Sequence, residues 1–261
     1  MAKRYILNCL QKGKSIIGLA IQLAKVEFKL RNEGSYLGVF WYLLNPILTF
    51  ALLFLVFSIS LGNNIPKYPL YLLLGIIMFN FFQSSTLEST KLMRDNNRLI
   101  KSIGFPRESL IIGLILKNLF SHLFEFIIFI CFFICLGLNL ISILFYLPII
   151  ILFLLFVFGF SLLLSSLAVY FVDLDNIWNF AIRLIWLGTP IFYAIDGQNH
   201  LFFFNLINPL YYFITLSRDL VIYNKMPEMW IILGSVGCTL IFFVLGIFVF
   251  NKLKIKMAEL I

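Results

Sequence analysis

The chain has 261 residues, of which 62% are hydrophobic and only 12% are charged. This composition excludes a soluble globular domain, because too few polar side chains remain to cover the surface of a single core. The formal net charge of +8 does not indicate a nucleic-acid-binding protein, since lysines and arginines also orient proteins in membranes. We therefore expect an all-α integral membrane protein with no nucleic-acid partner.

Residues 16–31 are the first predicted element, an amphipathic helix that lies on the membrane surface. Its side chains separate onto two faces, with Leu19, Leu23, Val26 and Leu30 on one and Gln22, Lys25 and Lys29 on the other. Gly34 lets the chain bend out of the surface, and Trp41 suits the boundary between headgroups and hydrocarbon. We assign residues 1–35 to a cytoplasmic and interfacial N-terminus.

Uncharged stretches separated by turn signals predict six transmembrane helices. They cover about residues 37–61, 70–89, 109–136, 143–170, 176–195 and 229–250. The segments GNNIPKYP (62–69), GLNLIS (137–142) and DLDN (173–176) separate them, because proline, glycine and capping residues end helices. All 261 residues then form one membrane domain, with a six-helix bundle at 37–250 and a cytoplasmic tail at 251–261.

The distribution of lysine and arginine predicts the orientation of the bundle. Fifteen of the 20 lie in segments on the same side of the membrane as the N-terminus, and three (Lys67, Arg218 and Lys225) lie in segments on the opposite side. The remaining two, Lys117 and Arg183, lie inside predicted spans. Because basic segments stay in the cytoplasm, both termini are predicted to be cytoplasmic. The outer connection at 196–228 is too long and too apolar for a solvated loop, which predicts short re-entrant helices before the last span.

Residues suited to catalysis are nearly absent from the sequence. The two histidines and four cysteines show no metal-ligand spacing, and GKS at 13–15 lacks the first glycine of a phosphate-binding loop. We therefore predict no catalytic residue, no metal and no cofactor bound by this chain. Inside the predicted spans, two roles stay open for His122, Glu125 and Arg183, which are a proton relay and contacts between helices. We favour the contacts. Lys117 and Arg183 lie near enough to the cytoplasm to extend toward it.

The predicted cytoplasmic loop at 91–109 combines basic charge with an apolar face. Its segment NNRLIKSIG indicates a short amphipathic helix with Leu99, Ile100 and Ile103 on one side. A plain cytoplasmic loop would need only the basic residues, whereas an exposed apolar face favours contact with a protein. We therefore favour docking of a partner at this loop.

Four segments of the chain together carry a resemblance to a known family. They are FKLRNEGSYLGVFWYLLNPIL at the first span, NRLIKSIGFPRE in the basic loop, VDLDNIWNFAIRLIWLGTPIFYAID around the fifth span and NPLYYFITLSRDLV before the last. Together they resemble the membrane subunits of ABC-2-type exporters, most closely those for O-antigen, other lipid-linked polysaccharides or teichoic acids. They occur in family order and span nearly the whole chain. Where the family usually has Arg-Asp, this chain has Val172-Asp173, which leaves Asp173 and Asp175 as the acidic groups of that loop.

The resemblance implies a homodimer in the cytoplasmic membrane, with a channel along the dimer axis. Two copies of a cytoplasmic ATP-binding subunit would hold ATP and magnesium, and the substrate would be a glycan on a lipid pyrophosphate carrier. The NRLIKSIGFPRE segment is similar to the family's coupling helix. The residues expected to contact the ATP-binding subunit are Asn97, Leu99, Ile100, Ile103, Gly104, Phe105 and Pro106.

Aromatic residues make up 18% of the chain, and their faces hold the C–H surfaces of sugars through weak contacts. The candidate channel-lining residues are Trp41, Tyr42, Phe79, Phe81 and Phe82, while most phenylalanines are expected to fill the bilayer. The candidate contacts for the pyrophosphate are Lys25, Lys29 and Arg31, although these residues also satisfy the charge rule for cytoplasmic segments.

Other functions stay open at the level of sequence. An ABC-2 exporter of a drug or small lipid would have the same architecture and would differ in the genes beside it. A proton-coupled transporter would depend on groups such as Glu125, and a membrane acyl- or glycosyltransferase would need a catalytic acid or base with a metal or histidine motif. A scaffold or channel would have no ATP-binding partner.

Overall fold

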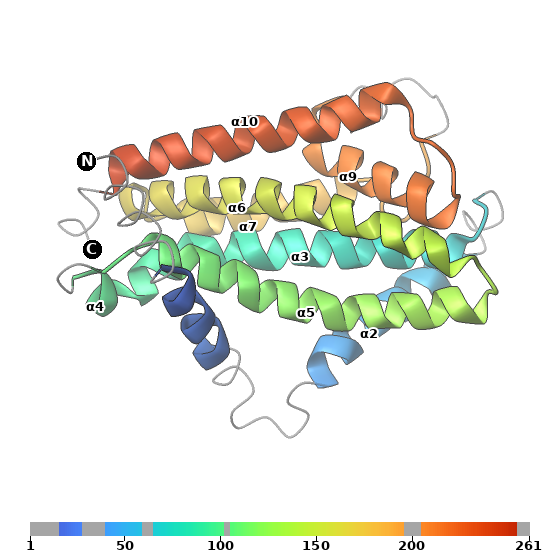
Figure 1. Cartoon of the computed structure of the whole chain (residues 1–261), viewed down its shortest axis with the longest axis horizontal. Helices are drawn as coiled ribbons and strands as arrows, with labels where there is room; N and C mark the ends of the chain where they lie inside the picture. Colours follow the sequence, from blue (N-terminus) through green and yellow to red (C-terminus); the bar gives the residue numbers. More distant parts are fainter. Residues whose placement is uncertain (1–15, 28–39, 59–64, 102–104, 196–204, 255–261) are drawn as a thin grey trace, which may run out of the picture.

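The computed structural model describes residues 16–27, 40–58, 65–101, 105–195 and 205–254, and the regular elements in these ranges are all helical (Figure 1). In chain order they are helix 16–27, α2 (Trp41–Phe57), α3 (Tyr68–Asp95), α4 (Asn97–Ile100), α5 (Glu108–Cys135), η3 (Leu140–Phe145), α6 (Tyr146–Tyr170), α7 (Leu174–Gly188), a turn at 205–207, α9 (Pro209–Ser217), η4 (Arg218–Ile222) and α10 (Met229–Leu253). The predicted all-α fold is confirmed for this part of the chain.

Four helical segments are long and apolar enough to cross a membrane: α3, α5, the continuous η3–α6 segment and α10. The first and fifth predicted spans are the shorter helices α2, with 17 residues, and α7, with 15. The expected end of the fifth span at residue 195 is wrong, since α7 ends at Gly188. Pro190 has no N–H and disfavours helix at the residue before it, so the helix stops there. The count of six spans stays a prediction.

Helix α3 is the central helix of the bundle, and it packs against α2, α5, α6, α7 and α9. Among the four candidate spans it is the least hydropathic and the most enclosed, with 78% of its most apolar window buried against 22–33% for the others. Ser85, Ser89 and Thr90 are buried on it, and each takes part in a hydrogen bond within the protein. The most polar span is therefore the one that the other helices shield from lipid.

The pair α6 and α10 lies side by side along nearly the whole bundle (Figure 1). Gly159 of α6 and Gly246 of α10 bring the two backbones together: a methyl group at position 159 would lie 2.5 Å from the Phe243 Cα. Small residues at such crossings allow the close approach that holds helices together in lipid.

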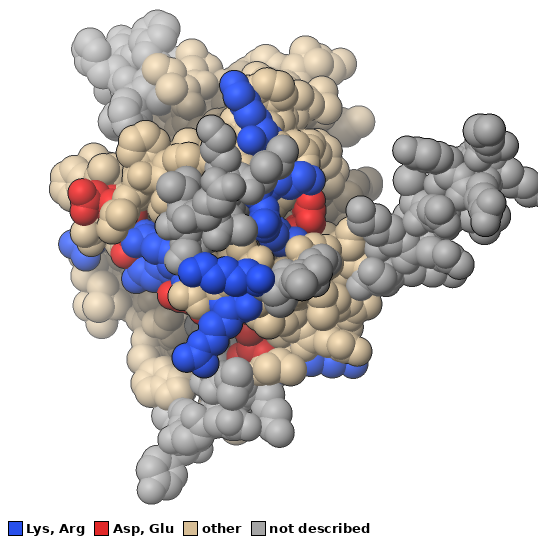
Figure 2. Space-filling model, turned by 90° about the vertical axis from the view of Figure 1, so that its left-hand side faces the viewer, with Lys and Arg blue, Asp and Glu red and all other residues tan. Residues whose placement is uncertain are grey.

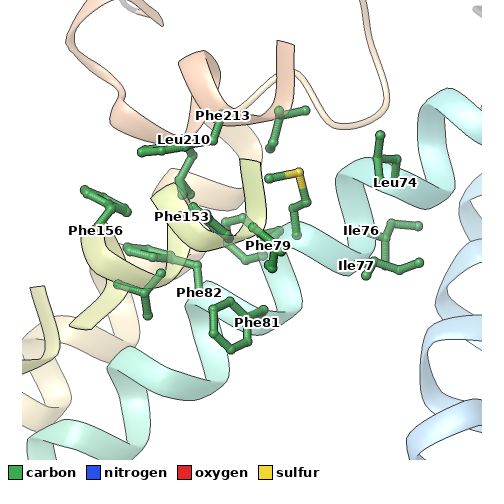
Figure 3. Close-up of a cluster of buried hydrophobic side chains, with 14 of the residues drawn as sticks. Leu74, Ile76, Ile77, Phe79, Phe81, Phe82, Phe153, Phe156, Leu210 and Phe213 are labelled. Carbon is green, nitrogen blue, oxygen red and sulfur yellow. The ribbon is translucent and has the colours of Figure 1, made fainter. Parts of the chain in front are cut away.

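A cluster of phenylalanine side chains forms the core between α3, α6 and α9 (Figure 3). The Phe82 and Phe156 rings stack at 5.8 Å, and the Phe213 ring lies 5.0 Å from the rings of both Phe153 and Phe156. Such offset and tilted pairs add to the stabilisation that burial itself provides. The core therefore joins the central helix to α9, which lies far away in sequence.

Short helices occupy the connection before α10, as the sequence predicts. Asn208 begins α9 by accepting a hydrogen bond from the Leu210 N–H, and Pro209 takes the first helical position. The chain then continues into η4, a π-helical turn that contains the buried Arg218. Whether these helices enter the outer leaflet stays a prediction.

Candidate functional site

We call one end of the bundle the α4 end, because α4 lies there with the C-terminal end of α10 (Figure 1). Figure 2 looks onto this end and shows lysine and arginine side chains gathered over it, with fewer acidic ones among them. The exposed basic residues here include Lys91, Arg98, Lys101 and Lys252. We call the opposite end of the bundle the far end. Within the described ranges, its basic residues are Lys67, Arg218 and Lys225.

Helix α4 is a single turn that directly follows α3, the central helix. Asn97 and Leu99 are exposed, the latter by 38%, whereas Ile100 is 3% exposed and belongs to the core. The expectation that Leu99 and Ile100 share one exposed face is therefore wrong, because neighbours on one helical turn point in different directions. Ile100 anchors the turn, and Leu99 offers the apolar contact.

The chain after α4 returns to the bundle at Phe105 and Pro106. The half-buried Phe105 ring packs against the core cluster, so it links the loop to the transmembrane helices. The Pro106 carbonyl accepts hydrogen bonds from the Ser109 hydroxyl at 2.6 Å and from the Ser109 N–H at 3.1 Å, which ties the loop to the first turn of α5. The predicted contacts Ile103 and Gly104 lie outside the described residues.

Asp175, at the start of α7, connects the α6–α7 turn to the α4 end of α3. Its carboxylate pairs with the Lys91 ammonium at 3.3 Å and accepts a hydrogen bond from the Thr90 hydroxyl at 3.0 Å. The Arg94 guanidinium donates to the Val172 carbonyl of the same turn at 3.3 Å. The acidic loop identified from the sequence thus interacts through Asp175, and we call this set of contacts the Asp175 clamp.

Helix 16–27 packs directly on α5 near the α4 end. Ala20 and Ala24 are buried there, and a methyl group at Gly113 of α5 would lie 3.3 Å from the Leu23 Cβ. Val26, predicted on the same apolar face as Leu23, is instead 55% exposed. Part of the predicted apolar face therefore packs on α5 and part of it is exposed. The small side chains of Ala20 and Ala24 allow helix 16–27 to approach α5 closely.

Lys117 of α5 bridges two carboxylates rather than extending toward the cytoplasm. Its ammonium lies 3.0 Å from the Glu27 carboxylate of helix 16–27 and 2.8 Å from that of Glu88 on α3. This corrects the expectation from the sequence, because carboxylates from two distant segments of the chain lie within reach of the ammonium. Of the candidate pyrophosphate contacts, Lys25 is exposed on helix 16–27, and Lys29 and Arg31 lie outside the described residues.

The structure corrects three of the five candidate channel-lining residues. Phe79 and Phe82 are 1% exposed and Phe81 is 3% exposed, so they fill the core between helices (Figure 3). A side chain enclosed by its own subunit cannot line a channel at the surface of that subunit. Trp41 is 49% exposed at the start of α2, and the side chain of Tyr42 lies outside what the structure describes.

Of the titratable residues inside the predicted spans, His122 and Glu125 lie on α5 and Arg183 lies on α7. The His122 ring of α5 bonds to the Tyr146 hydroxyl of α6 at 2.8 Å, which makes it a contact between helices. Glu125 is partly buried one turn further along α5, and Arg183 is exposed on α7. Arg183 lies beside an apolar stripe formed by Ile177, Phe180, Leu184 and Leu187, each at least 53% exposed.

The role of Arg218, which lies in the predicted outer connection at 196–228, does not follow from the sequence. Its side chain is 3% exposed, and its guanidinium donates to the backbone carbonyls of Tyr71, Pro190 and Ile191. At the same end the Tyr223 hydroxyl donates to the Pro66 carbonyl at 3.1 Å, and burial raises the pKa of Tyr223 to about 12. The only sequence signal was an arginine beside an apolar stretch.

Comparisons with known proteins match most of the chain. The family described as ABC-2 type transporter matches residues 19–222. Two proteins from Klebsiella pneumoniae, each named O-antigen export system permease protein RfbA, are 28% and 29% identical over 250 residues, or 94% of this chain and 96% of each relative. A protein of that name from Myxococcus xanthus is 24% identical over 215 residues, which are 81% of this chain and 83% of the relative. The matched region contains both α4 and Arg218.

Proposed function

Because the chain belongs to the ABC-2 type transporter family, we propose that it is the membrane-spanning permease subunit of an ATP-driven exporter of a lipid-linked, O-antigen-like polysaccharide. The observation that carries the proposal is the similarity over 94% of the chain to permeases named for O-antigen export. The α4 end supports it, because α4 directly follows the central helix α3 and carries the exposed apolar residue Leu99 on a basic surface.

In this proposal the α4 end faces the cytoplasm and receives two copies of an ATP-binding subunit, which hold ATP and magnesium. The gathering of basic residues at that end supports the orientation. Leu99 would insert into the ATP-binding subunit, and Ile100 and Phe105 would pass its movement to the bundle through their contacts with the core. Hydrolysis itself would take place in the partner, so the chain is a transport subunit and not an enzyme.

We further propose that two copies of the chain form a channel across the inner membrane. The apolar stripe of α7 and the exposed side of α2 support this, since neither is covered within the described part of the chain. Exposed residues on α2 include Trp41, Leu44, Leu48, Leu52 and Leu55. A continuous channel suits a long glycan, which a closed pocket would not hold, and Lys25 would help to attract the lipid pyrophosphate.

The test is depletion of this protein in its own organism, followed by extraction of the lipids. We expect glycan on its lipid pyrophosphate carrier to accumulate on the cytoplasmic side and to be lost from the cell surface. Return of the gene should reverse both effects. Accumulation of a teichoic acid, a drug or a small lipid instead would identify another ABC-2 substrate, and normal surface glycan in the depleted cells would refute the proposal.

A further inference from the structure

The buried guanidinium of Arg218 occupies a site made of backbone carbonyls at the far end. Its Nη1 donates to the Pro190 carbonyl at 2.6 Å, and its Nη2 donates to the Ile191 carbonyl at 2.9 Å and the Tyr71 carbonyl at 3.0 Å. Its central carbon lies 3.3 Å from the centre of the Tyr71 ring. A buried charge is costly unless it is bonded in this way, so the site is built for this residue.

The surrounding residues are shaped to admit the guanidinium. A methyl group at Gly75 of α3 would lie 2.7 Å from the Arg218 Nη2, so a larger residue there would displace it. Arg218 lies in a π-helical turn, and such turns are frequent at functional sites. A lysine could not reproduce the contacts, since one ammonium does not fork toward three carbonyls.

Several further hydrogen bonds join the same two segments. The Tyr71 hydroxyl donates to the Tyr193 carbonyl at 2.7 Å, and the Tyr68 hydroxyl donates to the Phe192 carbonyl at 3.0 Å. The segment 190–193, which follows the end of α7, is therefore held against the beginning of α3 by hydrogen bonds to its backbone carbonyls. We call Arg218 and these tyrosine contacts the Arg218 clamp.

Helix α7 is thus tied to α3 near both of its ends. The Asp175 clamp holds its beginning to Thr90 and Lys91, and the Arg218 clamp holds the segment after its end to Tyr71. Tyr71 and Thr90 are 19 positions apart on α3, which corresponds to about 29 Å along the helix. The two helices also pack against each other between the clamps. They therefore form a pair that spans the bundle from α4 to the far end.

We propose that Arg218 is a positioning residue for transport, which makes the end of α7 move with α3. A displacement of α3 imposed at α4 then reaches the far end of α7, where the apolar stripe of α7 also ends. This inference rests on the proposed function, because it takes α4 as the contact with the ATP-binding subunit. It adds a residue that acts without touching either ATP or the glycan.

The first experiment replaces Arg218 in the complete complex with its ATP-binding subunit. For Arg218→Met we expect the ATPase rate to stay within about twofold of wild type while glycan export falls by at least about tenfold, because a misplaced element costs function far from where force is applied. Glycan export by Arg218→Lys should lie between that of wild type and that of Arg218→Met. The matched control is Lys67→Met, at the same end, whose ammonium donates to the Ile222 carbonyl and which should export normally.

A disulfide provides the decisive second measurement. Position 75 approaches Ile191 closely, with a Gly75 methyl group 3.4 Å from the Ile191 Cα, so Gly75→Cys with Ile191→Cys suits a disulfide. In Arg218→Met, with the four native cysteines replaced by serine, we expect oxidation of this pair to restore export and reduction to abolish it. A loss of folding would lower ATPase activity together with export, so export that follows the redox state at an unchanged ATPase rate would assign the effect to the link between α3 and residue 191.

Three results would overturn the inference. They are normal export by Arg218→Met, equal loss of ATPase activity and export in both Arg218→Met and Arg218→Lys, and failure of the formed disulfide to restore export. If Arg218→Met does not reach the membrane, Arg218→Lys carries the same assay and the same disulfide. Failure of the proposed function is a different result, because complete loss of the gene would then leave glycan export unchanged.

Discussion

Lys117 shows at the scale of one residue how the bundle accommodates charge. Its side chain is 10% exposed and lies between two carboxylates that are 28% and 33% exposed, those of Glu27 and Glu88. Removal of the ammonium would leave two acidic groups close together in a poorly solvated region. One lysine therefore holds helix 16–27 to both α3 and α5.

We predict that Lys117→Met destabilises the protein, because both carboxylates lose their cation. The free energy of unfolding should fall by about 1–3 kcal/mol, less than for a fully buried pair since water still reaches these groups. Thermal unfolding in detergent would measure the change. Lys25→Met, an exposed lysine on the same helix 16–27, is the control, and equal melting temperatures for the two variants would contradict the prediction.

At the scale of elements, the contact between α6 and α10 depends on two glycines that face one another. We predict that Gly246→Ala lowers stability by about 1–3 kcal/mol, because the added methyl group overlaps the backbone of Gly159. Gly237→Ala on the same helix is the matched control, since open space surrounds that position. Chemical or thermal unfolding of both variants would decide. A neutral Gly246→Ala would show that the two helices can separate without cost.

Helix α4 is the element through which force is proposed to enter the bundle. We predict that Leu99→Asp leaves the protein inserted in the membrane but lowers export by at least about tenfold, since a carboxylate is costly to bury in the proposed apolar contact. Phe105→Asp should uncouple ATP hydrolysis from export, because its ring links the loop to the core. Arg98→Ala, an exposed neighbour, should export normally.

Co-purification of the ATP-binding subunit and the ATPase rate would distinguish these outcomes. Leu99→Asp should retain less of the partner, and Ile100→Asp should instead fail to insert stably because that side chain is buried. Unchanged export and unchanged co-purification in Leu99→Asp would remove α4 from the proposed contact.

At the scale of the whole molecule, the stripe of α7 is proposed to face a second copy of the chain. We predict that single cysteines at Phe180 and Leu184 are joined between subunits by a short thiol cross-linker in membranes, with the native cysteines removed. Leu233→Cys, equally exposed on α10, is the control and should stay unlinked. Linkage only at Leu233 would place the dimer contact on α10 instead.

The sequence by itself determined the class of the protein and the approximate limits of α5, α6 and α10. Uncharged stretches and breakers predicted α5 at 109–136 and α10 at 229–250, against Glu108–Cys135 and Met229–Leu253 in the structure. These limits depend on local chemistry, since proline, glycine and charge act on the residues beside them. The family resemblance also rested on short segments of the chain.

Only the tertiary structure decided which side of each helix is buried and which distant residues meet. Aromatic side chains suit a protein core, lipid and the surface of a sugar alike, so the pattern of Phe79, Phe81 and Phe82 does not show whether they face a core or a channel. Lys117 and Glu27 are 90 residues apart, and Arg218 and Tyr71 are 147 residues apart. Such pairs form only when the helices pack, and no local pattern encodes them.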